Sequence, residues 1–283
     1  MGMCQDKLTP REVSAVTQTV TLSFFRFSGL RARAWALMMM GAARRPLAQT
    51  PDIGFWKLCG AGKGEGFSPT VNPYTIAILA TWQTLELAQD RTASAPVFQR
   101  YRTRSAEDWT VFLQPRSVRG AWGGVAPFAP DDAPAAGPMA ALTRASIRKS
   151  ALMQFWKQVP DISANIGADP NVLFKAGIGE LPMLDQITFS ILPGKTTMDG
   201  FARTGPHGAA IKAVRDGRWF SEELFARFAV HSDRGTWNGT SPLKSRRLHD
   251  PISVFRHCRP GRNETRDDPD GHRRIHRWRA GLW

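Results

Sequence analysis

The feature that most constrains the fold of this 283-residue chain is an internal repeat. Residues 94–109 align without a gap on residues 204–219, at an offset of 110 positions, so that Trp109 matches Trp219. Looser similarity extends the pairing upstream over three further pairs of segments: 20–25 with 140–145, 51–55 with 170–174, and 76–79 with 188–191. A chain that carries one unit twice is expected to build a pseudo-symmetric structure from two similar halves.

Each unit is predicted to follow the order β-α-β-β-α-β, which is ferredoxin-like. Residues 20–27 (VTLSFFRF) alternate and are rich in strand formers, whereas residues 30–43 favour a helix that Pro46 closes. The further predicted strands are 53–58, 74–82, 109–113, 139–147, 171–178, 186–192 and 219–230, and the further helices are 85–92, 97–104, 151–166, 196–203 and 206–216. Two such four-stranded sheets facing one another make an α+β fold, a dimeric α/β barrel within one chain.

The predicted organisation has five parts. An irregular extension (1–17) precedes the first repeat (18–116), a linker rich in Gly, Pro and Ala (117–138) and the second repeat (139–232), and a basic tail (233–283) follows. Residues 244–283 hold 11 Lys and Arg against 5 Asp and Glu, a net +6 of the chain's +14, and four of its six histidines. Because Arg, His, Pro and Asp together are typical of shifted GC-rich coding, we expect this tail to be disordered and non-native or out of frame.

Composition excludes several classes of function. No run approaches the 18 apolar residues of a membrane span, and the start lacks the pattern of a secretory signal. Cys4, Cys59 and Cys258 are isolated, which favours a reducing, cytoplasmic compartment and disfavours a cysteine-based zinc site. The glycine-rich loop 60–66 lacks the Gly-Lys-Ser/Thr ending of a phosphate-binding loop. We do not expect the charge of the tail to contribute to function, and we therefore expect no nucleic-acid partner. The remaining net charge of +8 favours attraction to anionic membrane surfaces.

A histidine begins the most distinctive helix of the second repeat. His207, Ala210, Ile211 and Val214 fall on one helical face after Pro206. The neighbours of His207 on that face are small, which suits close approach of a flat macrocycle with a metal at its centre. The alternative is a partly buried histidine bonded to a backbone carbonyl. Val97 holds the matching place in the first repeat, so the pattern predicts a symmetric scaffold with an asymmetric site.

Five long blocks resemble the spheroidene monooxygenases, the carotenoid ketolases of purple phototrophic bacteria. They are residues 20–36 (VTLSFFRFSGLRARAWA), 51–57 (PDIGFWK), 109–113 (WTVFL), 159–180 (VPDISANIGADPNVLFKAGIGE) and 205–228 (GPHGAAIKAVRDGRWFSEELFARF). The resemblance covers about residues 18–242 and implies oxidation of an acyclic carotenoid such as spheroidene at C-2, where two successive hydroxylations with O2 give a ketone. The tail after residue 243 departs from it.

The resemblance also implies a haem, which proteins of this kind bind through a histidine. Haem iron is held by His, Cys, Met or Tyr, so we predict His207 as the axial ligand, with Cys59 and His231 as rivals. Lys212 and Arg215 are predicted to meet the haem propionates, unless they form only a solvated helix face. No catalytic residue is assigned. The implied partners are an electron-donor protein such as a ferredoxin, the carotenoid, and the surface of the intracytoplasmic photosynthetic membrane, where the enzyme would be peripheral.

An apolar polyene needs an apolar cavity or groove. Aromatic residues that could form its walls, or merely belong to the core, are Phe24, Phe25, Phe27, Trp35, Phe55, Trp56, Phe155, Trp156 and Phe174. Two other functions stay open for this fold: a non-catalytic barrel that carries haem or a lipid, and a cofactor-free monooxygenase in which His207 is structural.

Overall fold

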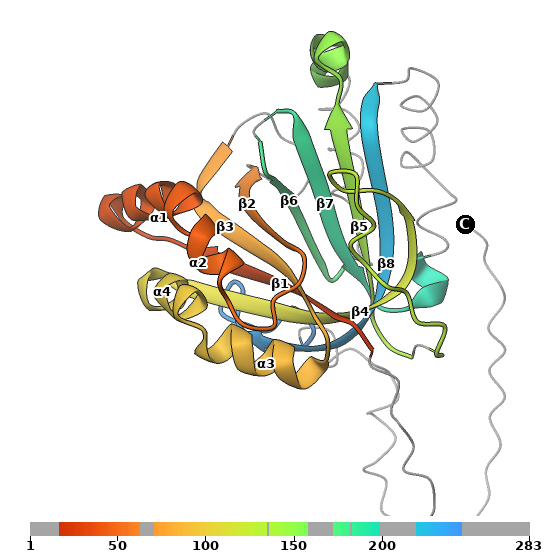
Figure 1. Ribbon diagram of the computed structural model, residues 1–283, viewed down its shortest axis with the longest axis horizontal. Coiled ribbons are helices and arrows are strands. Elements are labelled where there is room, and N and C mark those ends of the chain that lie inside the picture. Colours follow the sequence, from red (N-terminus) through yellow and green to blue (C-terminus); the bar gives the residue numbers. More distant parts are fainter. Residues whose placement is uncertain are drawn as a thin grey trace, which may run out of the picture. The chain divides into compact units, whose positions relative to one another are not determined.

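Eight antiparallel strands close into one barrel, in the order β1-β3-β2-β6-β7-β5-β8-β4 (Figure 1). The computed structural model describes residues 17–62, 71–134, 136–157, 172–181, 183–198 and 219–244, all within one compact unit, Met1–Leu248. The strands are β1 (Thr19–Arg26), β2 (Trp56–Gly62), β3 (Val71–Trp82), β4 (Glu107–Gly120), β5 (Met139–Ile147), β6 (Phe174–Gly179), β7 (Asp185–Leu192) and β8 (Phe220–Gly235). The helices are α1 (Leu30–Ala42), α2 (Arg44–Ala48), α3 (Leu85–Ser94), α4 (Pro96–Arg104) and the short 3₁₀ turn η1 (Lys149–Ala151).

The barrel consists of two sheets with the same strand order. The first sheet runs β4-β1-β3-β2 and the second β8-β5-β7-β6, so the predicted pair of ferredoxin-like repeats is confirmed. The sheets join at two seams of unequal length. Strands β4 and β8 pair along most of β4, from Trp109 opposite Gly235 to Gly120 opposite Leu224. Among the described residues, strands β2 and β6 pair at just two places, Gly60–Gly179 and Ala61–Ile178.

Local sequence explains the connections of the first repeat. Helix α3 begins after Thr84, whose side chain accepts a hydrogen bond from the backbone N–H of Leu87 at 3.3 Å. Helix α4 starts on Pro96, where the missing N–H costs nothing. Strand β2 begins at Trp56 and includes Gly60–Gly62, so it lies further along the chain than the predicted strand 53–58. The predicted helix 151–166 is described only to residue 157.

Side chains alternate between a filled barrel interior and the outer face of each sheet. In β1, Val20, Leu22 and Phe24 face the interior, which 22 buried residues from both repeats fill. Phe25 and Phe27 point the other way and pack with α1–α4 in a second core. The barrel is therefore a packed core between its two ends rather than a channel.

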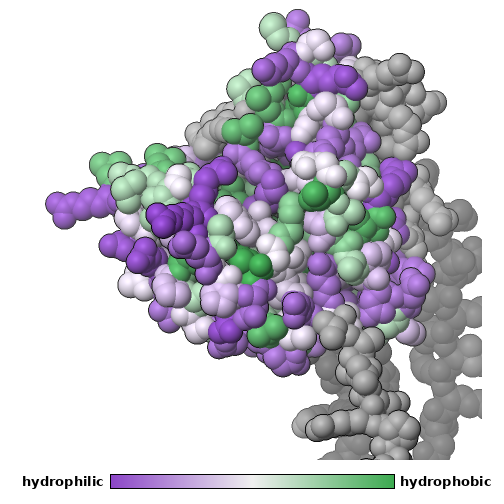
Figure 2. Space-filling model, viewed as in Figure 1, coloured by the Kyte–Doolittle hydropathy of each residue, from purple (hydrophilic) through white to green (hydrophobic). Residues whose placement is uncertain are grey.

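Helix α1 is apolar on both sides. Ala36 and Met39 are buried against the first sheet, while Leu30, Leu37 and Met38 are 80%, 55% and 59% exposed. Figure 2 shows hydrophobic atoms gathered over this helix beside strongly hydrophilic ones.

The two repeats end in the same turn, at an offset that the sequence alignment missed. Gly120 and Gly235 have φ of 94° and 87°, and a Cβ on either would lie 2.0 or 2.2 Å from a carbonyl oxygen of the neighbouring strand. Two residues later, Trp122 and Trp237 form the isolated bridges Trp122–Val125 and Trp237–Thr240. The matching positions are 115 residues apart in both pairs.

This register corrects the match of Trp109 to Trp219. Phe24 of the first repeat matches Arg144 of the second. Trp109 pairs with Phe24, and Leu224 pairs with Arg144, so Trp109 matches Leu224. Trp219 precedes β8 and packs outside the barrel with Phe155. The same comparison of strand pairing shows that β3 matches β7 at an offset of 110, so that Ile78 matches Thr188. The predicted match of residues 76–79 to 188–191 is therefore wrong by two residues. Five additional residues therefore lie between β7 and β8.

Two predicted boundaries also move. Residues 117–120 of the expected linker belong to β4, and Trp122 and Phe128 within it are buried, so this segment packs against the barrel. Strand β8 continues past residue 232 to Gly235, and described residues run on to 244. Residues 1–16 and 245–283, which include most of the expected extension and tail, lie outside the described residues.

Candidate functional site

The outer faces of the two sheets differ in side-chain size from strand to strand. One row across the second sheet runs Gly177, Thr188, Thr143 and Phe225, from β6 to β8. The matching row of the first sheet runs Leu58, Ile78, Ser23 and Thr110. In the next row, buried Phe25 of β1 is matched by Ala145 of β5. The second outer face is therefore lower than the first on β6 and β7, where Gly177 and Thr188 stand in place of Leu58 and Ile78, and higher on β8, where Phe225 stands in place of Thr110.

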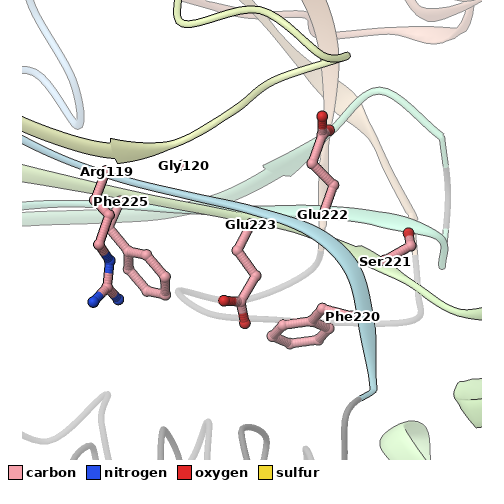
Figure 3. A pocket seen from close by; sticks show the side chains of 7 residues that line it. All are labelled: Arg119, Gly120, Phe220, Ser221, Glu222, Glu223 and Phe225. Carbon is pink, nitrogen blue, oxygen red and sulfur yellow. The ribbon is translucent and has the colours of Figure 1, made fainter.

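A pocket of about 500 Å³ opens at the β4–β8 side of this face (Figure 3). Figure 3 shows Arg119, Glu223, Phe225 and Phe220 on the same side of the ribbon, with Glu222 on the opposite side. The Arg119 guanidinium carbon lies 5.0 Å from the centre of the Phe225 ring. The pocket thus combines an apolar ring, a cation and a carboxylate.

Behind this face, one end of the barrel interior is ionic. Arg144 is 5% exposed and pairs with Asp185, at 3.1 Å, and with Glu222. Burial opposes ionisation of Glu222, but hydrogen bonds from the backbone N–H groups of Gly124 and Gly123, together with Arg144, outweigh it and lower the pKa of this carboxyl. This cluster neutralises a buried guanidinium and fixes the ends of β5, β7 and β8.

Comparison with known proteins identifies the family. The chain is 46% identical to spheroidene monooxygenase of Rhodobacter capsulatus over 232 residues, which cover 81% of this chain and 96% of that protein. It is 44% identical to spheroidene monooxygenase of Cereibacter sphaeroides over 229 residues (80% and 71%) and 34% identical to that of Rubrivivax gelatinosus over 208 residues (74% and 80%). The chain belongs to the spheroidene monooxygenase family. It is accordingly an oxidoreductase, as predicted, although no protein-family model matches it.

Solved structures confirm the fold alone. An aldoxime dehydratase in complex with butyraldoxime has a TM-score of 0.55 at 9% identity, covering 82% of this chain and 87% of that one. A second aldoxime dehydratase structure has a TM-score of 0.50 at 9% identity, covering 78% and 84%.

The predicted haem-binding residues His207, Lys212 and Arg215 lie outside the described residues, so their roles stay predictions. Of the two rivals as iron ligand, Cys59 is fully buried in the barrel interior, and that burial raises the pKa of its thiol. A thiol held neutral in an apolar interior is a poor source of a thiolate ligand. His231 is exposed on β8, with Nδ1 3.2 Å from Ser232 Oγ.

Most of the nine aromatic residues predicted as possible cavity walls belong to packed cores in the structure. Phe25, Phe27 and Trp35 pack around Tyr101, and Phe155 packs with Trp156. Phe55 contacts Trp122, and Trp56 packs against the core beneath α1 and α2. Of this set, only Phe24 and Phe174 line a second pocket, which lies beside Trp237.

Arg119, Glu223 and Phe225 are not predictable as site residues from the sequence, because they come together only through the pairing of β4 with β8. Within the described ranges, no helix is long and apolar enough to cross a membrane. Among the same residues, no group of three or more His, Cys, Asp or Glu side chains is arranged to hold a metal ion.

Proposed function

We propose that this chain is a haem-dependent monooxygenase that oxidises C-2 of acyclic carotenoids such as spheroidene to a ketone with O2. Membership of the spheroidene monooxygenase family supports the substrate class. Each hydroxylation inserts one oxygen atom of O2 into a C–H bond and reduces the other to water with two electrons and two protons. The second hydroxylation yields a geminal diol, which loses water to give the ketone. The electrons require a donor protein, for which a ferredoxin is suitable.

The contrast between the two outer faces is the observation that carries the haem proposal. A flat macrocycle needs a surface without projecting side chains, and Gly177, Thr188 and Thr143 offer one on β6, β7 and β5, bordered by the ring of Phe225 on β8. Arg119, at the edge of this face, supplies a cation for a propionate. The residues present therefore fit a haem, which would supply the activation of O2 when bound.

The position of His207 in the chain agrees with that surface. His207 lies between β7 and β8, as α3 and α4 lie between β3 and β4 in the first repeat. Val97, which matches His207 at the offset of 110 that β3 and β7 share, is 2% exposed and packs in the core on the outer face of the first sheet. By the pseudo-symmetry we propose that His207 ligates the haem iron at the outer face of the second sheet, with Lys212 and Arg215 toward the propionates.

We further propose that the enzyme works at a membrane surface, because a polyene substrate partitions into lipid. The exposed side of α1 presents Leu30, Leu37 and Met38, with exposed Arg31 and Arg44 beside them. Apolar side chains flanked by arginines suit shallow insertion into an anionic leaflet.

Absorption spectroscopy and product analysis of the full chain expressed with ample haem test the proposal. We expect a Soret band in the wild type, lost or shifted in His207→Ala and retained in the matched control His231→Ala. Wild type supplied with O2, a reductant and an acyclic carotenoid should form the ketone. Ketone formation without a Soret band would instead establish a cofactor-free monooxygenase, and a Soret band without ketone would refute the proposed activity.

A further inference from the structure

The two ends of the barrel are related by the pseudo-symmetry but are filled differently. At the Trp122 end, Lys57 Nζ pairs with Glu180 Oε2 at 2.9 Å, and Trp122 Nε1 donates to Glu180 Oε1 at 2.5 Å. Lys57 also lies over the Trp122 ring, 5.6 Å from its centre. An ion pair and a tryptophan therefore plug this end.

Strand register gives the matching residues at the other end. Gly60 of β2 matches Gly179 of β6 at the short seam, which makes Ala176 the match of Lys57 and Ala61 the match of Glu180. Trp237 is the match of Trp122. The tryptophan is thus retained at this end, while alanines stand at both positions of the ion pair.

A pocket of about 560 Å³ lies where the ion pair is missing, and both alanines line it. Its aromatic lining residues are Phe24, Tyr74, Phe174 and Trp237, and the ring centroids of Phe24, Phe174 and Trp237 lie 5.3–6.3 Å apart. The polar lining includes Asn72, Asn238 and the cationic residues Arg26 and Lys175, and no described lining residue is a carboxylate. The site is consequently apolar at its base and offers hydrogen-bond donors without negative charge.

The indole N–H of Trp237 is available as a hydrogen-bond donor. Arg26 covers its ring at 4.0 Å and is itself paired with Glu107 at 2.9 Å. The described part of the chain provides no acceptor for the Trp237 indole N–H, whereas the matching N–H of Trp122 is bonded to Glu180. A ligand that brings an oxygen acceptor on an apolar chain would complete this arrangement.

We propose that this Trp237 pocket binds the oxygen-bearing end of an acyclic carotenoid, with the Trp237 indole N–H donating to an ether, hydroxyl or ketone oxygen. The inference rests on the proposed function, because it assigns a site to part of that substrate. A pocket of this size takes one end of a C40 chain, not its whole length. Trp237 is accordingly a specificity-determining residue that distinguishes oxygenated polyene ends from plain hydrocarbon ends.

Two variants test the proposal in the full chain. The double variant Ala61→Glu/Ala176→Lys introduces at the Trp237 end the ion pair that Lys57 and Glu180 form at the Trp122 end, and the new side chains should fill the pocket. Trp237→Phe keeps an aromatic ring and removes the indole N–H donor. The matched control Ala93→Lys/Ser94→Glu adds the same charges at exposed positions of α3.

The measurement is the Kd, in detergent micelles, of two acyclic C40 polyenes, one with a terminal ether or ketone oxygen and one without. The double variant should weaken binding of both polyenes at least tenfold, and the control should not. Trp237→Phe should weaken the oxygenated polyene roughly fivefold, as loss of one neutral hydrogen bond allows, and leave the hydrocarbon unchanged. If Trp237→Phe folds and binds both polyenes as the wild type does, the pocket assignment is wrong.

The outcome for the pocket is separable from the outcome for the enzyme. The wild type's Soret band and ketone formation test the proposed function without any pocket variant. Normal wild-type activity together with unchanged polyene affinities in both variants would overturn only the pocket. A double variant that does not fold, judged by circular dichroism, leaves the decision to Trp237→Phe.

Discussion

Glu107 and Glu222 hold the same turn in the two repeats. Glu222 accepts hydrogen bonds from the backbone N–H groups of Gly123 and Gly124 at 2.9 and 2.7 Å, and Glu107 accepts one from Gly239 at 2.7 Å. Each carboxylate also pairs with an arginine of a neighbouring strand, Arg144 for Glu222 and Arg26 for Glu107. The strand ends at both extremities of the barrel therefore depend on ionised glutamates.

Acid should destabilise the barrel through these two residues. Burial opposes ionisation of both carboxyls, but backbone hydrogen bonds and arginines outweigh it, so the folded pKa of each lies below the ordinary value of about 4.5. A lowered folded pKa stabilises the fold above pH 4.5, and this contribution is lost as the pH falls through the folded value. Urea unfolding between pH 7 and 3 should show that loss, and a Glu107→Gln/Glu222→Gln variant should show a smaller one. Equal acid sensitivity in both proteins would contradict the assignment.

Replacing Glu222 alone should be costly at neutral pH. Glu222→Gln retains the shape but leaves Arg144 with only Asp185 as an anionic partner. We expect a loss of about 1–3 kcal/mol in the free energy of unfolding, measured by urea denaturation at pH 7. Asp132→Asn, at an exposed carboxylate of the segment between β4 and β5, is the control and should have little effect.

A methyl group at Gly120 should destabilise the protein strongly. Its φ of 94° is unfavourable for other residues, and an added Cβ would lie 2.0 Å from the Glu223 carbonyl oxygen. Gly120→Ala should cost at least about 2 kcal/mol in thermal or urea unfolding. Gly41→Ala has open space in α1 and should be neutral or stabilising by about 0.5–1 kcal/mol. Similar stabilities for the two variants would refute the role given to Gly120.

The Cys59 thiol should be unreactive in the folded protein. It is fully buried and its pKa is raised by that burial, so alkylation requires opening of the barrel. With Cys4 and Cys258 replaced by Ser, iodoacetamide should label the native chain far more slowly than the urea-unfolded chain. Cys59→Ala should also leave any Soret band unchanged, whereas a shifted band would restore Cys59 as a candidate ligand.

Acidic residues on α1 should weaken membrane association. Leu37→Glu and Met38→Glu remove apolar area and add negative charge, so each should reduce cosedimentation with anionic vesicles about tenfold or more. Met153→Glu, at a methionine that is 74% exposed outside α1, is the control. Binding of all three variants equal to that of the wild type would remove α1 as the contact.

The strand order could be predicted from sequence because local pattern decides it. Alternation in β1 and the helix signals around Thr84 and Pro96 act over a few residues, and the structure follows them. The register between repeats depends instead on pairing across the barrel, where β4 meets β8. A gap-free alignment that matched Trp109 with Trp219 could not show the five extra residues before β8.

One signal for the correct register was available in the sequence. Residues 120–125 (GAWGGV) and 235–240 (GTWNGT) share a Gly-x-Trp-x-Gly pattern. It fell in segments classified as a linker and a tail, where no structure was expected. The depression of the second outer face was harder to foresee, because the meaning of Gly177, Thr188 and Thr143 comes from their lying side by side on three strands.

The unequal seams make one side of the barrel easier to open than the other. The long β4–β8 seam can serve as a hinge, and the short β2–β6 seam as a latch. Breaking the β2–β6 pairing disrupts the contacts at two residue pairs, whereas the β4–β8 pairing holds the repeats together along most of β4. Opening should therefore begin beside Gly60 and Gly179, and amide hydrogens there should exchange with solvent earlier than those of Val111 or Phe228. The Trp237 pocket borders this latch through Ala61 and Ala176, so a long polyene has a route into its pocket that leaves the hinge intact.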